Sequence, residues 1–225
     1  SHGCKYPCYA YMMAKRFKKV SSYEEWIQPK LVDNIFPLLS KELPKYREKI
    51  RTLHLCFSTD PYMYGHPEIC RASTQIIEKA NVFGVHCSVL TKGVLPVELA
   101  NMPLENEYGI TVVTLDEEFR KEMEPGAAPM EERIRALEAL SEQGCYTWIS
   151  IEPYPTPNIH EQNLDQLLER VSFANRIIFG RLHYNKQVTA YKGYQDFYNT
   201  CAKKVIAFCD EHEIDYHIKK GTLVE

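Results

Sequence analysis

The sequence lacks long hydrophobic runs, and this absence excludes several classes of protein. No apolar stretch approaches the roughly 18 residues that a membrane-spanning helix needs. No secretory signal opens the 225 residues, and repeats or low-complexity segments are missing. We therefore expect no membrane partner, a cytoplasmic location and a single domain over residues 1–225.

A strong excess of charge of either sign is missing too. The formal net charge is only −3, with 44% hydrophobic and 25% charged residues. This mixture is typical of a globular protein with a real core. The balance argues mildly against obligate binding to duplex DNA, because neutralising phosphates needs Lys and Arg.

The eight cysteines include only one pair at the short spacing of metal ligands, Cys4 and Cys8. No second pair follows, and His2 is the one nearby candidate for a third ligand. By themselves these residues leave an iron–sulfur cluster, a zinc ion and no metal open. We expect the other six to be reduced thiols inside the protein: Cys56, Cys70, Cys87, Cys145, Cys201 and Cys209.

Hydrophobic periodicity predicts strands alternating with helices. Ser22, Pro67 and Gly144 mark helix ends, and a basic segment from Met12 begins a first helix. Such alternation favours a parallel sheet with helices outside it. The expected strands are 53–62, 85–93, 108–115, 145–157, 175–182 and 214–221, and the main expected helices are 23–43, 66–81, 131–144, 163–174 and 194–212.

Polar residues cluster where these strands end. The carboxyl ends of parallel strands meet at one edge of a sheet, which is where α/β proteins place their sites. We therefore expect one site to collect residues from several strands. These strand-end residues are Ser58, Thr59, Asp60, Thr91, Lys92, Glu152, Arg181, Asn185 and Lys219.

Several short motifs together resemble the radical SAM enzymes, especially the branch related to spore photoproduct lyase. The opening C-K-Y-P-C-Y-A is similar to the cluster loop of that branch, which often reads G-C-x-Y-C-Y-A. Three further segments resemble the branch along most of the chain: F-S-T-D-P-Y at 57–62, L-T-K at 90–92, and E-P-G at 124–126 followed by the helix with Arg133.

The resemblance implies an α/β fold of the partial (β/α)6 parallel barrel type. Two departures from the family pattern concern the start of the sequence. Tyr11 stands where a third cysteine would follow Cys4 and Cys8, so these two look like the last two ligands. We expect the first ligand, and the first barrel strand, upstream of Ser1.

The resemblance also implies two cofactors, a [4Fe–4S] cluster and S-adenosylmethionine, with Cys4 and Cys8 as metal ligands. In the family, one electron from the cluster cleaves S-adenosylmethionine to a 5′-deoxyadenosyl radical, which abstracts hydrogen. The remaining assignments are Tyr6 near the adenine, Ser58, Thr59 and Asp60 for the ammonium, Lys92 or Arg133 for the carboxylate, and Glu152 for the ribose.

Substrate-side residues are expected on the last strands, at Arg181, His183, Asn185 and Lys219. The reaction is expected to be of the lyase or transferase type, with a nucleic-acid lesion or base as one candidate substrate and no assigned catalytic residue. An electron donor such as flavodoxin or ferredoxin is the implied partner. Two alternatives stay open, a metal-free or zinc-bearing (β/α) binding module and a barrel hydrolase using Asp60, His183 and Glu152.

Overall fold

A computed structural model describes residues 3–56 and 58–223. Its centre is a parallel sheet of six strands in the order β1-β2-β3-β4-β5-β6, which confirms the predicted α/β class and the partial parallel barrel. The strands are β1 (Leu53–Leu55), β2 (Cys87–Thr91), β3 (Glu107–Thr111), β4 (Tyr146–Tyr154), β5 (Arg176–Arg181) and β6 (Asp215–Ile218).

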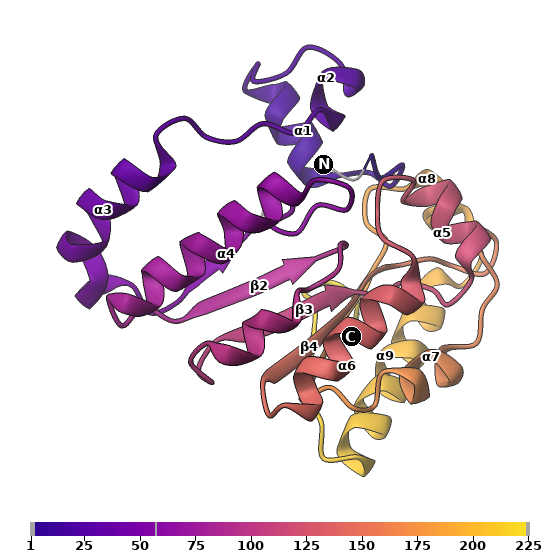
Figure 1. The fold of residues 1–225 in the computed structure, drawn as a ribbon. Coiled ribbons are helices and arrows are strands. Elements are labelled where there is room, and N and C mark those ends of the chain that lie inside the picture. Colours follow the sequence, from indigo (N-terminus) through magenta and orange to yellow (C-terminus); the bar gives the residue numbers. More distant parts are fainter. Residues whose placement is uncertain (1–2, 57, 224–225) are drawn as a thin grey trace.

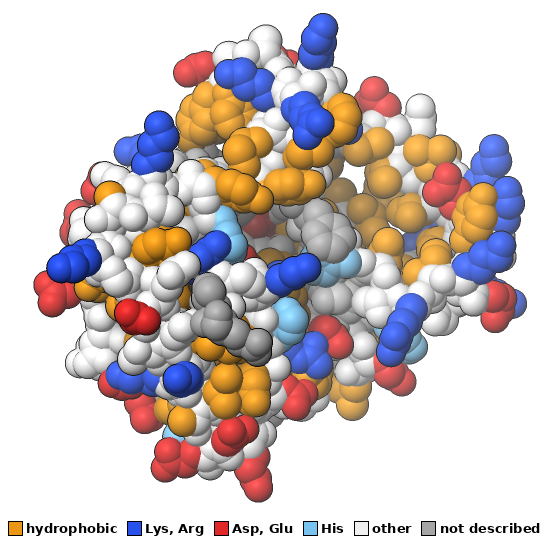
Figure 2. All heavy atoms as spheres, turned by 180° about the vertical axis from the view of Figure 1, so that it is seen from behind, with side chains coloured by type: hydrophobic (Ala, Val, Ile, Leu, Met, Phe, Trp, Pro, Cys, Tyr) orange, Lys and Arg blue, Asp and Glu red, His pale blue; other side chains and the backbone are white. Residues whose placement is uncertain are grey.

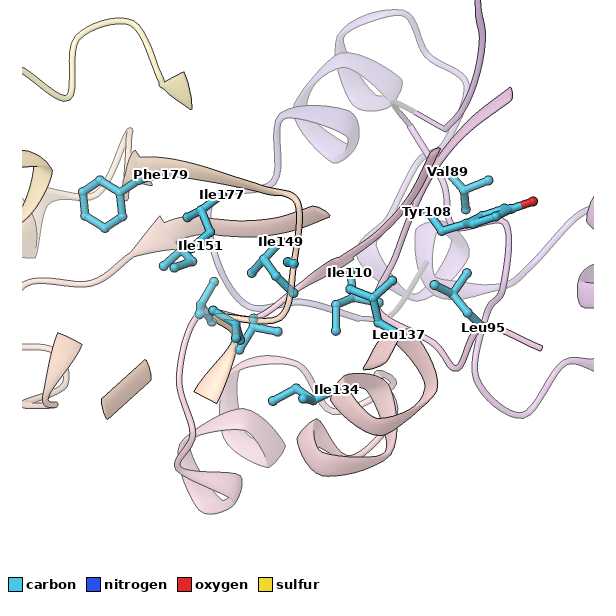
Figure 3. Packing of buried hydrophobic residues seen from close by; sticks show 14 of the residues in the cluster. Val89, Leu95, Tyr108, Ile110, Ile134, Leu137, Ile149, Ile151, Ile177 and Phe179 are labelled. Atoms are coloured by element: carbon cyan, nitrogen blue, oxygen red, sulfur yellow. The ribbon is translucent and has the colours of Figure 1, made fainter. Parts of the chain in front are cut away.

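Helices cover one face of this sheet, as Figure 1 shows. Strand residues at alternate positions point to the same face, and the outward-facing set is mostly apolar. Ile110, Ile149 and Ile177 pack with Ile134 and Leu137 of the helix layer, and all five are fully buried (Figure 3). Each such side chain contributes about 1.5–3 kcal/mol of burial free energy. The main covering helices are α4 (Pro67–Val82), α6 (Met130–Glu142), α7 (Leu164–Arg170) and α9 (Tyr194–Glu211).

The N-terminal part departs from the predicted helix over 23–43. It forms α1 (Tyr9–Arg16), α2 (Tyr23–Ile27) and α3 (Ile35–Tyr46), followed by the 3-10 turn η1 (Arg47–Lys49). Ser22 caps α2 as predicted, because its side chain accepts from the Glu25 amide at 3.2 Å. Pro29 then ends the helix, since the residue before a proline avoids helical backbone and Gln28 is extended.

Other segments also differ from their predicted bounds. The first strand stops at Leu55, because the polar residues 58–60 turn away, so most of the predicted 53–62 is loop. Two short capped helices, α5 (Glu117–Met123) and α8 (Lys186–Ala190), and the 3-10 turn η2 (Val97–Asn101) were not predicted. Within the described residues, no helix is long and apolar enough to cross a membrane.

Candidate cofactor pocket at the carboxyl ends of the strands

A cavity of about 220 Å³ lies where the first strands end and the N-terminal loop crosses them. It collects residues that are far apart in the sequence, as the polar strand ends predicted. Both short-spaced thiols line it. The other lining residues are Tyr6, Pro7, Ala10, Trp26, Cys56, Ser58, Thr59, Asp60, Leu90, Thr91, Lys92, Thr111 and Pro153.

Asp60 joins the ends of β1 and β2 at this cavity. Its Oδ1 accepts from the Tyr62 amide at 2.9 Å and from the Thr91 hydroxyl at 2.5 Å, and its Oδ2 accepts from the Lys92 amide at 2.8 Å. Such bonds to a buried carboxylate fix the loop, because breaking them leaves a charge without partners. Asp60 therefore positions the two strand ends.

Lys92 connects the thiol loop to a buried ion network. Its Nζ lies 3.6 Å from Cys4 Sγ, bonds to the Glu124 carboxylate, and sits 5.6 Å from the centre of the Tyr6 ring. Burial works to lower the pKa of Lys92, but the neighbouring Cys4 and Glu124 together raise it above its ordinary value. The ammonium therefore stays charged beside the Cys4 sulfur.

Arg133 lies behind this cavity. Its guanidinium donates to Glu124 Oε2 at 3.1 Å and to the carbonyl oxygens of Thr111 and Ala128, and both Arg133 and Glu124 are fully buried. Burial acts to raise the pKa of Glu124, yet Lys92 and Arg133 hold it below its ordinary value. Of the two cations predicted for a carboxylate, only Lys92 lines the cavity.

Two further residues of the cavity matter for what it can hold. The Tyr6 hydroxyl is buried with no hydrogen-bond partner among the described residues, so it can donate to an incoming group. Cys56, which we expected to be a reduced thiol inside the protein, also lines the cavity. Burial, aided by Asp60, raises its pKa to about 11, so this thiol is protonated at neutral pH.

The described residues fit part of a metal cluster. Cys4 and Cys8 bring two thiols into one cavity, one of them beside a lysine, which suits thiolate ligation. Across residues 3–56 and 58–223, however, no three His, Cys, Asp or Glu side chains are arranged to hold a metal ion. His2, the third ligand considered from the sequence, lies outside the described residues, as does Phe57 of the strand-end motif.

The remaining predicted residues do not join this cavity. Glu152 lies on the face of the sheet opposite the helices but does not line this cavity, and its carboxylate is 3.6 Å from Lys219 Nζ. Arg181, His183 and Asn185 line a separate hollow beside α8, where Arg181 Nε donates to His183 Nδ1 at 3.3 Å and Asn185 caps the helix. The triad of the alternative hydrolase, Asp60, His183 and Glu152, is thus spread over three cavities.

Several solved structures superpose on this fold. A spore photoproduct lyase variant with bound AdoMet and dinucleoside spore photoproduct superposes with a TM-score of 0.58 at 12% identity, covering 96% of this chain and 72% of that chain. A domain of pyruvate-formate lyase-activating enzyme from Bacteroides vulgatus gives 0.51 at 15% identity, covering 75% and 99%. The chain has the fold of the radical SAM enzymes.

A third radical SAM structure, SuiB from Streptococcus suis, gives a TM-score of 0.50 at 13% identity, covering 93% of this chain and 60% of that chain. Among curated proteins, the uncharacterized protein ORF301 of Acidianus two-tailed virus is 26% identical over 184 residues, or 76% of this chain. The chain spans 58% of the length of that viral relative. No protein-family profile matches the sequence.

Proposed function

We propose that this protein is a radical SAM enzyme that holds a [4Fe–4S] cluster and S-adenosylmethionine in the cavity at the carboxyl ends of the strands. The observation that carries the proposal is the meeting of Cys4 and Cys8 with Lys92 and the residues 58–60 in one cavity of this fold. When bound, the cluster supplies the electron that cleaves S-adenosylmethionine reductively.

Each side chain has a task in this proposal. Cys4 and Cys8 would hold the cluster through their sulfur atoms, with the Lys92 ammonium 3.6 Å from the Cys4 sulfur. The hydroxyls of Ser58 and Thr59 accept the ammonium of S-adenosylmethionine, since the oxygens of Asp60 already hold the strand ends together.

Lys92 also supplies the cation nearest to the methionine carboxylate, with Arg133 keeping its counter-ion Glu124 in place. The buried Tyr6 hydroxyl donates to the adenine or ribose. Glu152 lies outside this cavity and is left to the substrate side.

The cluster also needs an external reductant, for which we propose a flavodoxin or ferredoxin. Residues 15–19 form an exposed K-R-F-K-K run at the end of α1, the helix that begins directly after Cys8. The described part of 1–22 has no acidic residue. An acidic redox protein matches this charge. In Figure 2 the upper part of the molecule, which carries α1 and α2, shows Lys and Arg beside hydrophobic side chains.

Anaerobic reconstitution with iron and sulfide tests the function directly. With dithionite and S-adenosylmethionine, the protein should bind iron and release 5′-deoxyadenosine, measured by mass spectrometry. Cys4→Ser and Cys8→Ser should abolish both, whereas Cys70→Ser, which changes a half-buried thiol outside the cavity, should change neither. Iron binding or 5′-deoxyadenosine release that survives loss of both ligands would refute the proposal.

A further inference from the structure

The hollow beside α8, where β5 ends, has a volume of about 380 Å³. It shares no lining residue with the cofactor pocket, so the proposed function does not use it. Pockets of this size commonly hold small molecules. Its lining contains an arginine, a lysine and a histidine, Arg181, Lys186 and His183, and none of its lining residues is an aspartate or a glutamate. The charge of this hollow is therefore positive.

Arg181 differs from the other arginines that are shielded from solvent. The arginines that are buried or half-buried in the described part of the chain are Arg120, Arg133, Arg170, Arg176 and Arg181. The first four each form an ion pair with a glutamate carboxylate. Arg181 forms no ion pair with a carboxylate of residues 3–56 and 58–223, and its side chain bonds only to a histidine. A half-buried cation without a counter-ion favours an anion that comes from outside.

His183 adds a donor to the same hollow. Its Nδ1 accepts from Arg181 Nε at 3.3 Å. Burial, aided by Arg181 and opposed by Glu152, lowers the pKa of His183, so the ring is neutral at pH 7. A neutral imidazole that accepts at Nδ1 carries its proton on Nε2. The Nε2–H of His183 and the terminal nitrogens of Arg181 therefore remain able to donate to a ligand.

The backbone that carries these donors is fixed before any ligand binds. The Arg181 amide donates to Thr222 Oγ1 at 3.3 Å, and the Leu182 amide donates to the Tyr154 carbonyl oxygen at 3.0 Å. Tyr184 has a φ of +57°, which is uncommon for a residue other than glycine and is often found at functional sites. A site that is already ordered loses little entropy on binding.

We propose that this hollow binds the phosphate group of a small phosphomonoester. The planar guanidinium of Arg181 and the Nε2–H of His183 donate to phosphate oxygens, and Lys186 supplies a second positive charge. Two cations match a phosphomonoester, which is mostly a dianion above neutral pH, better than a carboxylate or a phosphodiester with a single charge.

The remainder of the hollow has room for the organic part of the ligand. Leu182, Val188 and the ring of Tyr194 line it beside the cations, and its volume exceeds what a phosphate ion fills. The inference goes beyond the proposed function and does not rest on it, because no residue of the cofactor pocket takes part.

The test uses the full chain without iron and phenyl phosphate as the probe, followed at pH 8 by saturation-transfer difference NMR. Arg181→Gln should weaken the binding at least about tenfold, because it removes charge-assisted hydrogen bonds. Lys186→Gln should weaken it about three- to tenfold, because the exposed ammonium is partly screened by solvent. Arg71→Gln and Lys203→Gln are the matched controls and should bind unchanged, since each removes one exposed charge that does not line the hollow.

Two further ligands test the class of the anion. Diphenyl phosphate, a diester with a single charge, should bind at least about tenfold more weakly than phenyl phosphate, and inorganic phosphate should compete with phenyl phosphate but bind more weakly because it lacks the ring. Circular dichroism checks that Arg181→Gln folds, and Lys186→Gln changes an exposed side chain.

Three results would overturn the inference: no saturable binding of phenyl phosphate, binding of diphenyl or inorganic phosphate as tight as that of phenyl phosphate, or unchanged binding in folded Arg181→Gln or in Lys186→Gln. Failure of the proposed function gives a different result, because 5′-deoxyadenosine release is then absent while the phenyl phosphate titration is unchanged.

Discussion

The two faces of the sheet carry opposite chemistry, although their residues alternate along the same strands. On β4, Ile149 and Ile151 point outward and are fully buried under helices, whereas Trp148 and Ser150 point inward and line a cavity. The outward contacts of the two isoleucines are apolar burial, which stabilises the fold without specifying a ligand. Among the inward residues, Trp148 has a buried indole N–H with no hydrogen-bond partner in the described part of the chain, which lowers stability.

The largest expected effect comes from the outer face. Ile149→Ala should lower the free energy of unfolding by about 2–5 kcal/mol, because it removes a fully buried side chain from a close-packed layer. Urea unfolding followed by circular dichroism measures it. A decrease in the free energy of unfolding below about 1 kcal/mol would show that the outer layer is loosely packed. The two faces would then not differ in packing as described.

A smaller loss of folding free energy is expected when a larger side chain is introduced on the inner face of the sheet. Gly109→Val should cost about 1–3 kcal/mol, because its side chain would overlap the Trp148 indole. In a Trp26→Phe background, which leaves Trp148 as the only tryptophan, the Trp148 emission should also shift as the ring moves. Gly84→Ala is a useful comparison, since nothing lies near its Cβ and its cost comes only from a φ of +72°. Unchanged emission in Gly109→Val would contradict the described contact between Gly109 and the indole.

Removing one hydroxyl from each face of β4 should change the stability by different amounts. Thr147 points outward, and its Oγ1 donates to Asn175 Oδ1 at 3.2 Å, so Thr147→Val should cost about 0.5–1.5 kcal/mol. Ser150→Ala should change the free energy of unfolding by less than about 0.5 kcal/mol, because the inward hydroxyl loses no bond. Equal losses in the two variants, measured by urea unfolding, would mean that Ser150 has a structural partner.

The smallest effect is a pH dependence from the inner face. Burial lowers the pKa of His54, with Lys219 adding to the shift and Glu107 opposing it. The unfolded chain therefore takes up a proton more readily, so this contribution to stability is complete above pH 6.5 and is lost as the pH falls below it. His54→Gln should flatten part of the decline in melting temperature between pH 7 and 5, whereas the exposed His86→Gln should not.

Much of the architecture was predictable from local patterns. Alternating apolar strands and capped helices indicated the parallel sheet, and the polar strand ends indicated that residues 58–60 and 91–92 would meet. The cysteine spacing singled out the loop that crosses them. The short helices α5 and α8 were missed, although Asp116 and Asn185 are the capping residues that mark them.

The individual site residues were less predictable. Glu152 was placed with the cofactor because it ends a strand, but its even position on β4 turns it to the inner face beside Lys219. Arg133 was a candidate ligand because it follows the E-P-G segment, yet Glu124 and two carbonyl oxygens occupy its guanidinium. Both outcomes depend on which residues pack around each side chain in the folded chain. The expectation that strand-end residues meet in one site does not predict those neighbours.

The sequence by itself determined the six strands in their order and most of the covering helices, because helix caps, prolines and hydrophobic periods act within a few residues of one another. It also determined that Cys4 and Cys8 stand at ligand spacing. Only the tertiary structure decided that Lys92 approaches Cys4, and that Gly109 admits the ring of Trp148. Those contacts join residues 88 and 39 positions apart, and close packing across parallel strands, not any local preference, sets them.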